Sequence, residues 1–265
     1  MKRSALAALI LTAALLAPGA SASAATVASH PSSLSSSQKR YLSVVEKGFR
    51  AASSRWGNRR HHWYNALLHD SNRYPLATIW DFVPLFEAAD YTALASPTSE
   101  NVKRVIHFAD YAARYWDRNV TPAPGVRRKT PGYTPYMGSW NDPETWFDDN
   151  GWWGLAFMDA AKAMSRARRY NLSSRYVGDA KRAFTFIYDN AWDSAGGGGL
   201  WWNTHHSSGR SSEALAAGTD LAARLYQTTG LLFYLHAAEK YITWANDNIQ
   251  AQDLSLIHIS EPTRP

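Results

Sequence analysis

The sequence predicts an all-α fold built from helical hairpins, and three observations lead to this prediction. Apolar residues recur at helical spacing in most segments, and no segment between them alternates like a half-buried strand. Turn residues separate the helical segments, so that the hairpins have about 35 to 45 residues each. Repeats of that length are typical of a solenoid or a toroid, in which each hairpin packs against its neighbours.

The N-terminus has the parts of a secretory signal peptide, which we assign to residues 1–24. Lys2 and Arg3 are positively charged, an apolar run covers 5–16, and small residues then offer cleavage sites. The apolar run is shorter than the 18 or so residues of a membrane span, so a membrane anchor is the weaker alternative. We therefore expect a secreted, extracellular protein without stable membrane insertion. The serine-rich segment 25–36 is expected to be a flexible leader.

Composition limits the class of protein. The chain of 265 residues has no cysteine, which excludes a disulfide framework and a thiolate zinc site. A formal net charge of +6, scattered over helices, argues against a nucleic-acid partner but is compatible with weak attraction to an anionic cell surface. Twelve tryptophans and fourteen tyrosines, several in loops rich in glycine and proline, suit a cleft in which rings stack on sugars. We expect no metal and no organic cofactor.

The first helices are expected at 37–54, at 76–93 and from 99 onward, with Trp80 and Asp81 in the first turns of the second helix. A long connection without secondary structure follows over 119–142. Its aromatic residues favour the wall of a cleft, and the alternative is a surface loop with incidental aromatics. These aromatic residues are Tyr133, Tyr136 and Trp140.

The central stretch of the chain is TWFDDNGWWGLAFMDAA, residues 145–161. Its second half has apolar residues on one helical face, starting with Trp153. Asn150 and Gly151 are poor residues for a helix interior, so the helix is expected to begin at or just after Asp148 and Asp149. Neighbouring residues within a helix point about 100° apart, whereas at a helix entrance both carboxylates can reach one cleft.

Two carboxylates in an aromatic-lined cleft have the chemistry of glycoside hydrolysis. One protonates the leaving oxygen, and the other attacks the anomeric carbon or activates water. The alternative is that one aspartate caps the helix and the other is a solvated charge near its positive end. The surrounding tryptophans favour the catalytic interpretation.

The second half of the chain continues the helical pattern. A helix capped by Ser173 or Ser174 is expected to run to Ala191, and helices at 212–226 and 231–249 are joined by a tight turn. The run GGGGLWW at 196–202 is a sharp turn signal. It lacks the preceding strand and the following Lys-Ser/Thr pair of a phosphate-binding loop, which we therefore exclude.

The last twelve residues, LSLIHISEPTRP at 254–265, do not continue the helical pattern. They resemble the translation of a sequencing adapter, so we treat them as a non-native tail, with a natural disordered tail as the alternative. The folded domain is then 37–253, and we expect it to be the N-terminal part of a longer one.

Three blocks of sequence resemble glycoside hydrolase family 76, the endo-α-1,6-mannanases: DDNGWWGLAFMDA at 148–160, GGGGLWWNT at 196–204, and LAARLYQTTG at 221–230. The resemblance implies an (α/α)6 toroid of twelve helices, of which about the first seven are present. It also implies a retaining mechanism with Asp148 as nucleophile and Asp149 as general acid/base. One departure is SSEALAAGTD at 211–220, which lacks an expected asparagine-containing pattern and puts some substrate contacts in doubt.

The resemblance and the local pattern together give the candidate substrate-binding residues. For Trp153, which begins the apolar face, packing in the core is at least as good an interpretation as lining the cleft. The candidates are Trp146, Asn150, Trp201, Trp202, Trp80, Asp81 and Tyr136.

The leading hypothesis is thus a secreted retaining glycoside hydrolase that cleaves α-1,6-mannan, its polysaccharide partner. One alternative is a wall transglycosylase on the same fold, because both enzymes share the covalent step. The other is a non-catalytic carbohydrate-binding protein, which would keep the tryptophans but have no need of both Asp148 and Asp149. The sequence predicts no oligomeric state.

Overall fold

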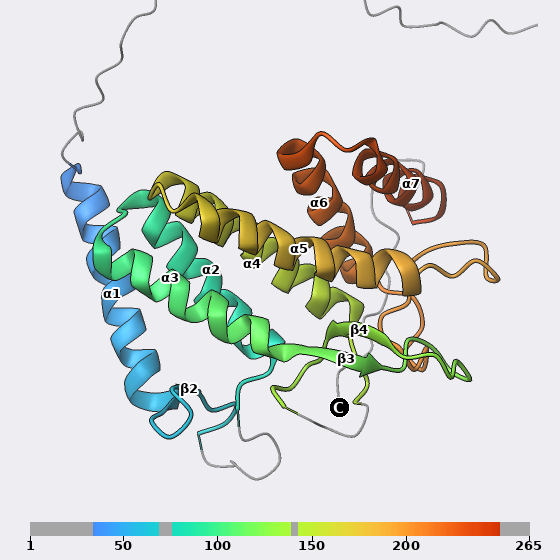
Figure 1. The fold of residues 1–265 in the computed structure, drawn as a ribbon, viewed down its shortest axis with the longest axis horizontal. Coiled ribbons are helices and arrows are strands. Elements are labelled where there is room, and N and C mark those ends of the chain that lie inside the picture. The colour runs from blue at the N-terminus through green and yellow to red at the C-terminus, as the bar shows by residue number, and fades with distance from the viewer. Residues whose placement is uncertain (1–33, 69–75, 139–142, 250–265) are drawn as a thin grey trace, which may run out of the picture.

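The computed structural model describes residues 34–68, 76–138 and 143–249, and confirms the all-α prediction (Figure 1). Seven α-helices make up most of these residues. Helix α4 is the centre of the arrangement, since it packs against α2, α3, α5 and α6. The helices are α1 (Ser36–Trp56), α2 (Ile79–Ala95), α3 (Ser99–Ala112), α4 (Phe147–Arg166), α5 (Tyr170–Asn190), α6 (Ser212–Thr229) and α7 (Leu232–Asn248).

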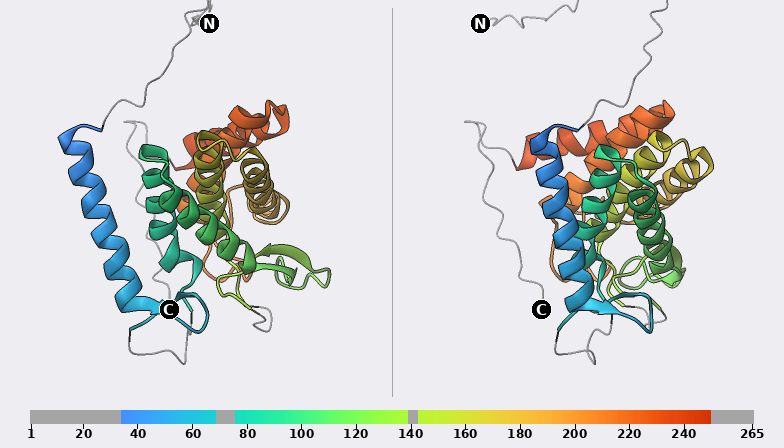
Figure 2. Two further views of the ribbon diagram at one scale, coloured as in Figure 1. Left: turned by 60° about the vertical axis from the view of Figure 1, so that its left-hand side comes forward. Right: turned by 90° about the vertical axis from the view of Figure 1, so that its left-hand side faces the viewer.

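Two layers of helices follow from these contacts. Helix α4 lies between α2 and α6. Helix α3 packs against α2, α5 packs against α4, and α7 packs against α6. Helix α1 flanks α2 at the edge of the molecule, as the two turned views show (Figure 2). This alternation of helices is the hairpin repeat that the sequence predicts.

Small residues bring α4 close to α6. A Cβ atom on Gly151 would lie 2.6 Å from the Cβ of Ala217, and one on Gly154 would lie 2.3 Å from a methyl group of Leu221. On its other side α4 buries Trp153 completely, with the Trp153 ring 5.7 Å from that of Phe86. The structure therefore gives Trp153 the core role, and its alternative placement in a cleft wall is wrong.

The expectation that no strands occur is also wrong. Two antiparallel pairs are present: β1 (Gly57–Asn58) with β2 (Trp63–Tyr64), and β3 (Trp116–Val120) with β4 (Thr130–Tyr133). The second pair lies partly inside the predicted long loop at 119–142. These strands have two to five residues, too few to produce a recognisable alternation, and β4 contains Pro131 and Gly132.

Several helix ends differ from the predicted ones. Helix α2 begins after Thr78, whose side chain forms a capping box with Asp81. Helix α5 begins at Tyr170 without a side-chain cap, so the expected start at Ser173 or Ser174 is wrong. The predicted tight turn after α6 is present, because Gly230 adopts the left-handed conformation with φ of 69°.

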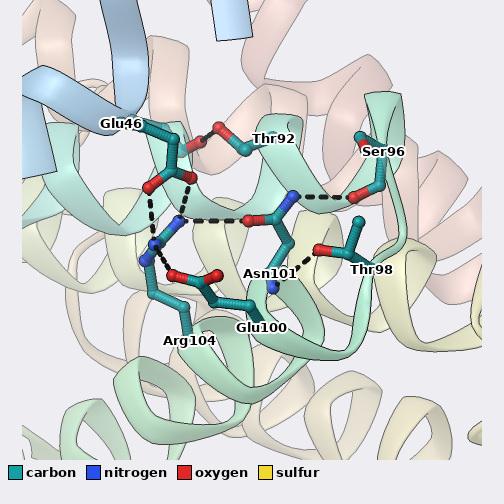
Figure 3. A network of polar contacts seen from close by, with 8 residues as sticks. Glu46, Thr92, Ser96, Thr98, Glu100, Asn101 and Arg104 are labelled. Carbon is teal, nitrogen blue, oxygen red and sulfur yellow. Dashed lines mark hydrogen bonds and ion pairs between the residues drawn. The ribbon is translucent and has the colours of Figure 1, made fainter. Parts of the chain in front are cut away.

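A polar network ties α1 to α3 (Figure 3). The Arg104 guanidinium donates to both carboxylate oxygens of Glu46, at 2.8 and 2.9 Å, and to Oδ1 of Asn101 at 3.2 Å. It also lies 4.2 Å from the centre of the Phe49 ring. A bidentate pair that also stacks on an aromatic ring fixes the angle between the two helices.

Three predicted segments lie wholly or largely outside the described residues: the signal peptide at 1–24, the leader at 25–36, of which only the last three residues are described, and the tail at 254–265. Trp140 also lies outside them. Within the described ranges, none of the helices combines the length and the apolar character that crossing a membrane requires.

Candidate active site

A cavity of about 390 Å³ lies beside the N-terminal ends of α2 and α4. Five of the predicted site residues meet there: Trp80, Asp81, Tyr136, Trp146 and Asp149. They come from three separate parts of the chain, namely the start of α2, the segment after β4 and the start of α4. The remaining lining residues are Ala66, Leu67, Thr78, Pro135 and Glu144.

Backbone pairing holds the start of α4 in place. The N–H of Phe147 donates to the carbonyl of Trp202 at 2.9 Å, and the N–H of Thr204 donates to the carbonyl of Thr145 at 3.0 Å. These bonds join the start of α4 to the segment that follows the glycine run. They also satisfy one of the N–H groups that a helix start leaves without an intrahelical partner.

Both aspartates lie in the first turn of α4, so the prediction that the helix begins at or after them is wrong. The N-cap residue is Trp146 and makes no side-chain cap bond, so neither aspartate caps the helix. Because successive helical side chains diverge, the two carboxylates have different surroundings. Asp149 lines the cavity, whereas Asp148 is fully buried and its Oδ2 accepts a hydrogen bond from Nε1 of Trp202 at 3.0 Å.

Asn150 is fully buried and is not one of the residues that line the cavity. Its Oδ1 accepts from the N–H of Tyr133, and its Nδ2 donates to the carbonyls of Tyr133 and Trp146, each at 2.9 Å. The side chain thus completes the backbone hydrogen bonds of β4 and fastens that strand to α4. This arrangement gives Asn150 a positioning role, and its contact with substrate stays a prediction.

The two tryptophans after the glycine run do not line the cavity. Trp202 is buried and its ring packs edge-on against Trp146 at 4.7 Å, beside Asp148. Trp201 is half-buried and stacks on the ring of His206 at 4.3 Å. Trp202 therefore contacts Asp148 and does not line the cavity, and Trp201 packs against His206 within the loop that follows it.

The glycine run is shaped by its close approach to α7. Gly198 and Gly199 have positive φ, and a Cβ on either would lie within 2.7 Å of the Trp244 ring. Arg210 closes the loop by donating to Asp193 at 2.8 and 3.0 Å. The burial of the Asp193 carboxyl acts to raise its pKa, but the hydrogen bonds from Arg210 outweigh this effect and hold the pKa below its usual value.

Glu144 is a cavity residue that the sequence interpretation missed. Its Oε1 accepts from Oγ of Ser207 at 3.2 Å and lies 3.7 Å from Nδ1 of His205. It stands four residues before Asp148, and its position close to the aspartate pair is the only signal that would have identified it.

A second cavity, of about 640 Å³, lies toward the other end of α4 and contains none of the predicted site residues. Both oxygens of Asp159 accept from Arg224 at 3.1 Å, and Tyr91 donates to Asp159 at 3.0 Å. Burial and the Asp159 carboxylate raise the pKa of Tyr91 to about 12. Asp90 nearby is fully buried, and its burial and the charge of Asp159 raise its pKa well above the usual value. We regard this cluster as structural.

No group of three or more histidine, aspartate or glutamate side chains is arranged to hold a metal ion in the part of the chain that the structure describes. The charged side chains that line the first cavity are carboxylates. It contains Asp81, Glu144 and Asp149, with Asp148 directly behind.

Comparison with known proteins places this geometry in context. The family model described as glycosyl hydrolase family 76 matches residues 105–258. That match includes the aspartate pair, Glu144 and the glycine run. A comparison with curated proteins finds no significant match.

Solved structures share the fold at low sequence identity. A family 76 α-mannanase of Bacteroides thetaiotaomicron has a TM-score of 0.68 at 21% identity, with 82% of this chain and 56% of that one covered. A family 76 mannosidase of the same species has a TM-score of 0.66 at 17% identity, with 81% and 55% covered. The chain thus spans little more than half the length of these relatives.

A third structure is an α-1,6-mannanase of Salegentibacter sp. HEL1_6, in an inactive variant with two consecutive aspartates changed to asparagine and in complex with α-1,6-mannotriose. Its TM-score is 0.56 at 13% identity, and 80% of this chain and 53% of that one are covered. A D-mannose isomerase also matches, with a TM-score of 0.57 at 13% identity and 82% and 57% covered. At these identities the likeness concerns the fold alone.

Proposed function

This chain belongs to glycosyl hydrolase family 76, and from that premise we propose that the protein is a secreted retaining glycoside hydrolase that cleaves α-1,6-mannosidic bonds in mannan. The observation that carries the proposal is the aspartate pair in the first turn of α4, with Asp149 lining a cavity between aromatic side chains. Paired carboxylates at a sugar-sized cavity are the groups that glycoside hydrolysis requires.

Each aspartate has a separate task in this mechanism. Asp149, which borders the cavity, protonates the glycosidic oxygen as the bond breaks and later accepts a proton from water. Asp148 attacks the anomeric carbon and forms the covalent glycosyl-enzyme, which water then hydrolyses with net retention. Trp202 holds the Asp148 carboxylate in one orientation by its hydrogen bond, which supports a fixed line of attack.

The burial of Asp148 sets a requirement on the mechanism. Because its carboxylate is fully covered, the side chains around it must shift when substrate binds before the carboxylate reaches an anomeric carbon. Catalytic contacts in ligand-free enzymes often tighten only in the complex with substrate. Trp146, which lines the cavity and packs edge to face against Trp202, is the side chain that we expect to move.

The choice of mannan as substrate comes from the relatives and from the cavity. The mannanase of Salegentibacter was solved with α-1,6-mannotriose after two consecutive aspartates had been replaced, and this chain has consecutive aspartates in the first turn of α4, of which Asp149 lines the cavity. Trp80, a residue that is 48% exposed, lines the cavity, and tryptophan is a type of side chain on which sugars stack. The mechanism uses carboxylates and water alone, so it needs no metal or organic cofactor.

Reducing-end release from linear α-1,6-mannan tests the proposal. We expect the wild type to release reducing ends, and Asp148→Asn and Asp149→Asn each to lower turnover by orders of magnitude. Asp189→Asn, which removes an exposed carboxylate at the end of α5, is the control and should keep wild-type turnover. Mannan binding without hydrolysis by the wild type would instead support a carbohydrate-binding protein.

A wall transglycosylase would share the covalent intermediate and pass the sugar to another glycan. Product analysis with an added acceptor sugar separates the two activities. Hydrolysis predicts free reducing ends at all acceptor concentrations, whereas transfer predicts elongated products.

A further inference from the structure

The sequence predicts positive charge that is scattered over helices, but the hairpin of β3 and β4 also has a concentration of it. Residues 116–133 contain four basic side chains and one acidic side chain, a net charge of +3 in a protein with a net charge of +6. All four basic side chains are exposed, and three of them are consecutive at the tip. They are Arg118, Arg127, Arg128 and Lys129.

The same hairpin is attached to the wall of the active-site cavity. Tyr133 at the end of β4 pairs with Asn150, the residue after Asp149. The chain then continues into Pro135 and Tyr136, which line the cavity. A four-residue strand extends about 10 Å, so the basic tip lies beyond the cavity wall at the same end of the helices. Figure 1 shows the hairpin extending from the helical body at this end.

Packing and a hydrogen bond give the hairpin a defined position. Its base is fixed by Tyr133, which is buried against Trp116 with the ring centres 4.9 Å apart. Toward the tip, the ammonium group of Lys129 donates to the hydroxyl of Thr121 across the hairpin. The backbone is therefore anchored at the base of the hairpin and at Lys129, which lowers the entropy lost when the basic side chains bind a partner.

The cavity has the opposite charge. Asp81, Glu144 and Asp149 line it, and its described lining includes no basic side chain. An anionic group inside the cavity would be repelled by these carboxylates, whereas the same group at the hairpin tip would be attracted. The two surfaces together favour a ligand that is neutral where it is cleaved and anionic farther along.

We propose that the β3–β4 hairpin binds phosphate or carboxylate groups carried by the glycan substrate at a distance from the cleaved bond. This inference rests on the proposed function and narrows its substrate class to anionic mannans. Arg127 and Arg128 are consecutive and exposed, and a guanidinium group matches the planar, bidentate hydrogen bonding that phosphate and carboxylate groups accept.

A membrane surface is the less favoured partner for this hairpin. Among the described residues of the tip, Val126 is the one large apolar side chain that is exposed. Insertion into a membrane interface requires a larger apolar face than a single valine. The attachment of the hairpin to the cavity wall also fits a polymer that occupies both places.

Calorimetric titration with two α-1,6-manno-oligosaccharides, identical except for one phosphate on a terminal sugar, tests the inference. We expect the phosphorylated ligand to bind roughly threefold to tenfold more tightly, as exposed ion pairs allow. This preference should disappear in the double variant Arg127→Gln/Arg128→Gln and should weaken at high salt. The matched control is Arg168→Gln/Arg169→Gln, an adjacent exposed pair at the other end of α4, which should keep the preference.

The outcomes separate this inference from the proposed function. If the wild type neither binds nor hydrolyses the neutral oligosaccharide, the proposed function fails. If it binds both ligands equally, or if both double variants lose the preference alike, the inference alone is overturned. Hairpin-dependent binding to anionic phospholipid vesicles without a preference for the phosphorylated glycan would also overturn it, in favour of a membrane partner.

Discussion

The hydrogen bond from Trp202 to Asp148 leads to a prediction about catalysis. Replacing Trp202 with phenylalanine keeps an aromatic ring beside Trp146 but removes the indole N–H that donates to Oδ2 of Asp148 at 3.0 Å. A hydrogen bond to a charged group contributes about 1.5–3 kcal/mol. If this contribution is lost in the transition state, turnover falls roughly tenfold to a hundredfold, since each 1.4 kcal/mol is about tenfold in rate.

The assay is steady-state release of reducing ends from α-1,6-mannan, with thermal unfolding measured in parallel. We expect kcat to fall and KM to change little, because the bond positions the nucleophile and does not touch substrate. The matched control is Trp201→Phe, since Trp201 stacks on His206 and not on either aspartate. Turnover of Trp202→Phe within about twofold of the wild type would refute a positioning role, as would an equal loss in both variants.

Three further predictions concern stability. At neutral pH, Asp90→Asn should raise the free energy of unfolding by about 1–3 kcal/mol, because burial raises the pKa of this carboxyl well above its usual 3.8 and folding disfavours its ionised form. The gain should vanish as the pH falls to about 3, below the usual pKa, where the unfolded carboxyl is also largely protonated, and an equal gain at both pH values in thermal unfolding would contradict it. Asn150→Ala should cost about 3 kcal/mol in urea unfolding, since it leaves buried backbone groups of Tyr133 without partners; a loss under 1 kcal/mol would count against the positioning role. Gly151→Ala should lower the free energy of unfolding by about 1–2 kcal/mol, because overpacking against the Cβ of Ala217, 2.6 Å away, outweighs the better helix propensity of alanine. Adding Ala217→Gly to this variant should restore the stability. If it does not, the contact with Ala217 is not the cause of the loss.

The helices were predictable because their apolar faces are long and regular. The face that begins at Trp153 extends over several turns, and a periodicity of that length identifies a helix from sequence alone. The short strands could not be predicted in the same way. Strand β4 is defined by the pairing of Tyr133 with Trp116 and Asn150, which are distant in sequence, and Pro131 and Gly132 contradict local strand propensity.

The candidate site was predictable to the extent that its residues belong to a local motif. Asp149 and Trp146 lie within one short stretch of sequence. Trp80 and Tyr136 are distant in sequence and reach the same cavity only because α2 and the segment after β4 pack against α4. The start of α4 was misjudged because Asn150 and Gly151 have poor helix propensity. Tertiary contacts override that propensity, since the Asn150 amide bonds to β4 and Gly151 admits α6.

The central claim is that Asp148 becomes covalently linked to the sugar. The most direct measurement is mass spectrometry of peptides from the protein after reaction with a 2-deoxy-2-fluoro mannosyl fluoride, which slows breakdown of a glycosyl-enzyme. We expect one added sugar on the peptide that contains Asp148, with fragmentation assigning it to that residue and not to Asp149, and no label in Asp148→Asn. A label on Asp149 would reverse the two roles, and hydrolysis of mannan with inversion and without any covalent label would contradict the retaining mechanism.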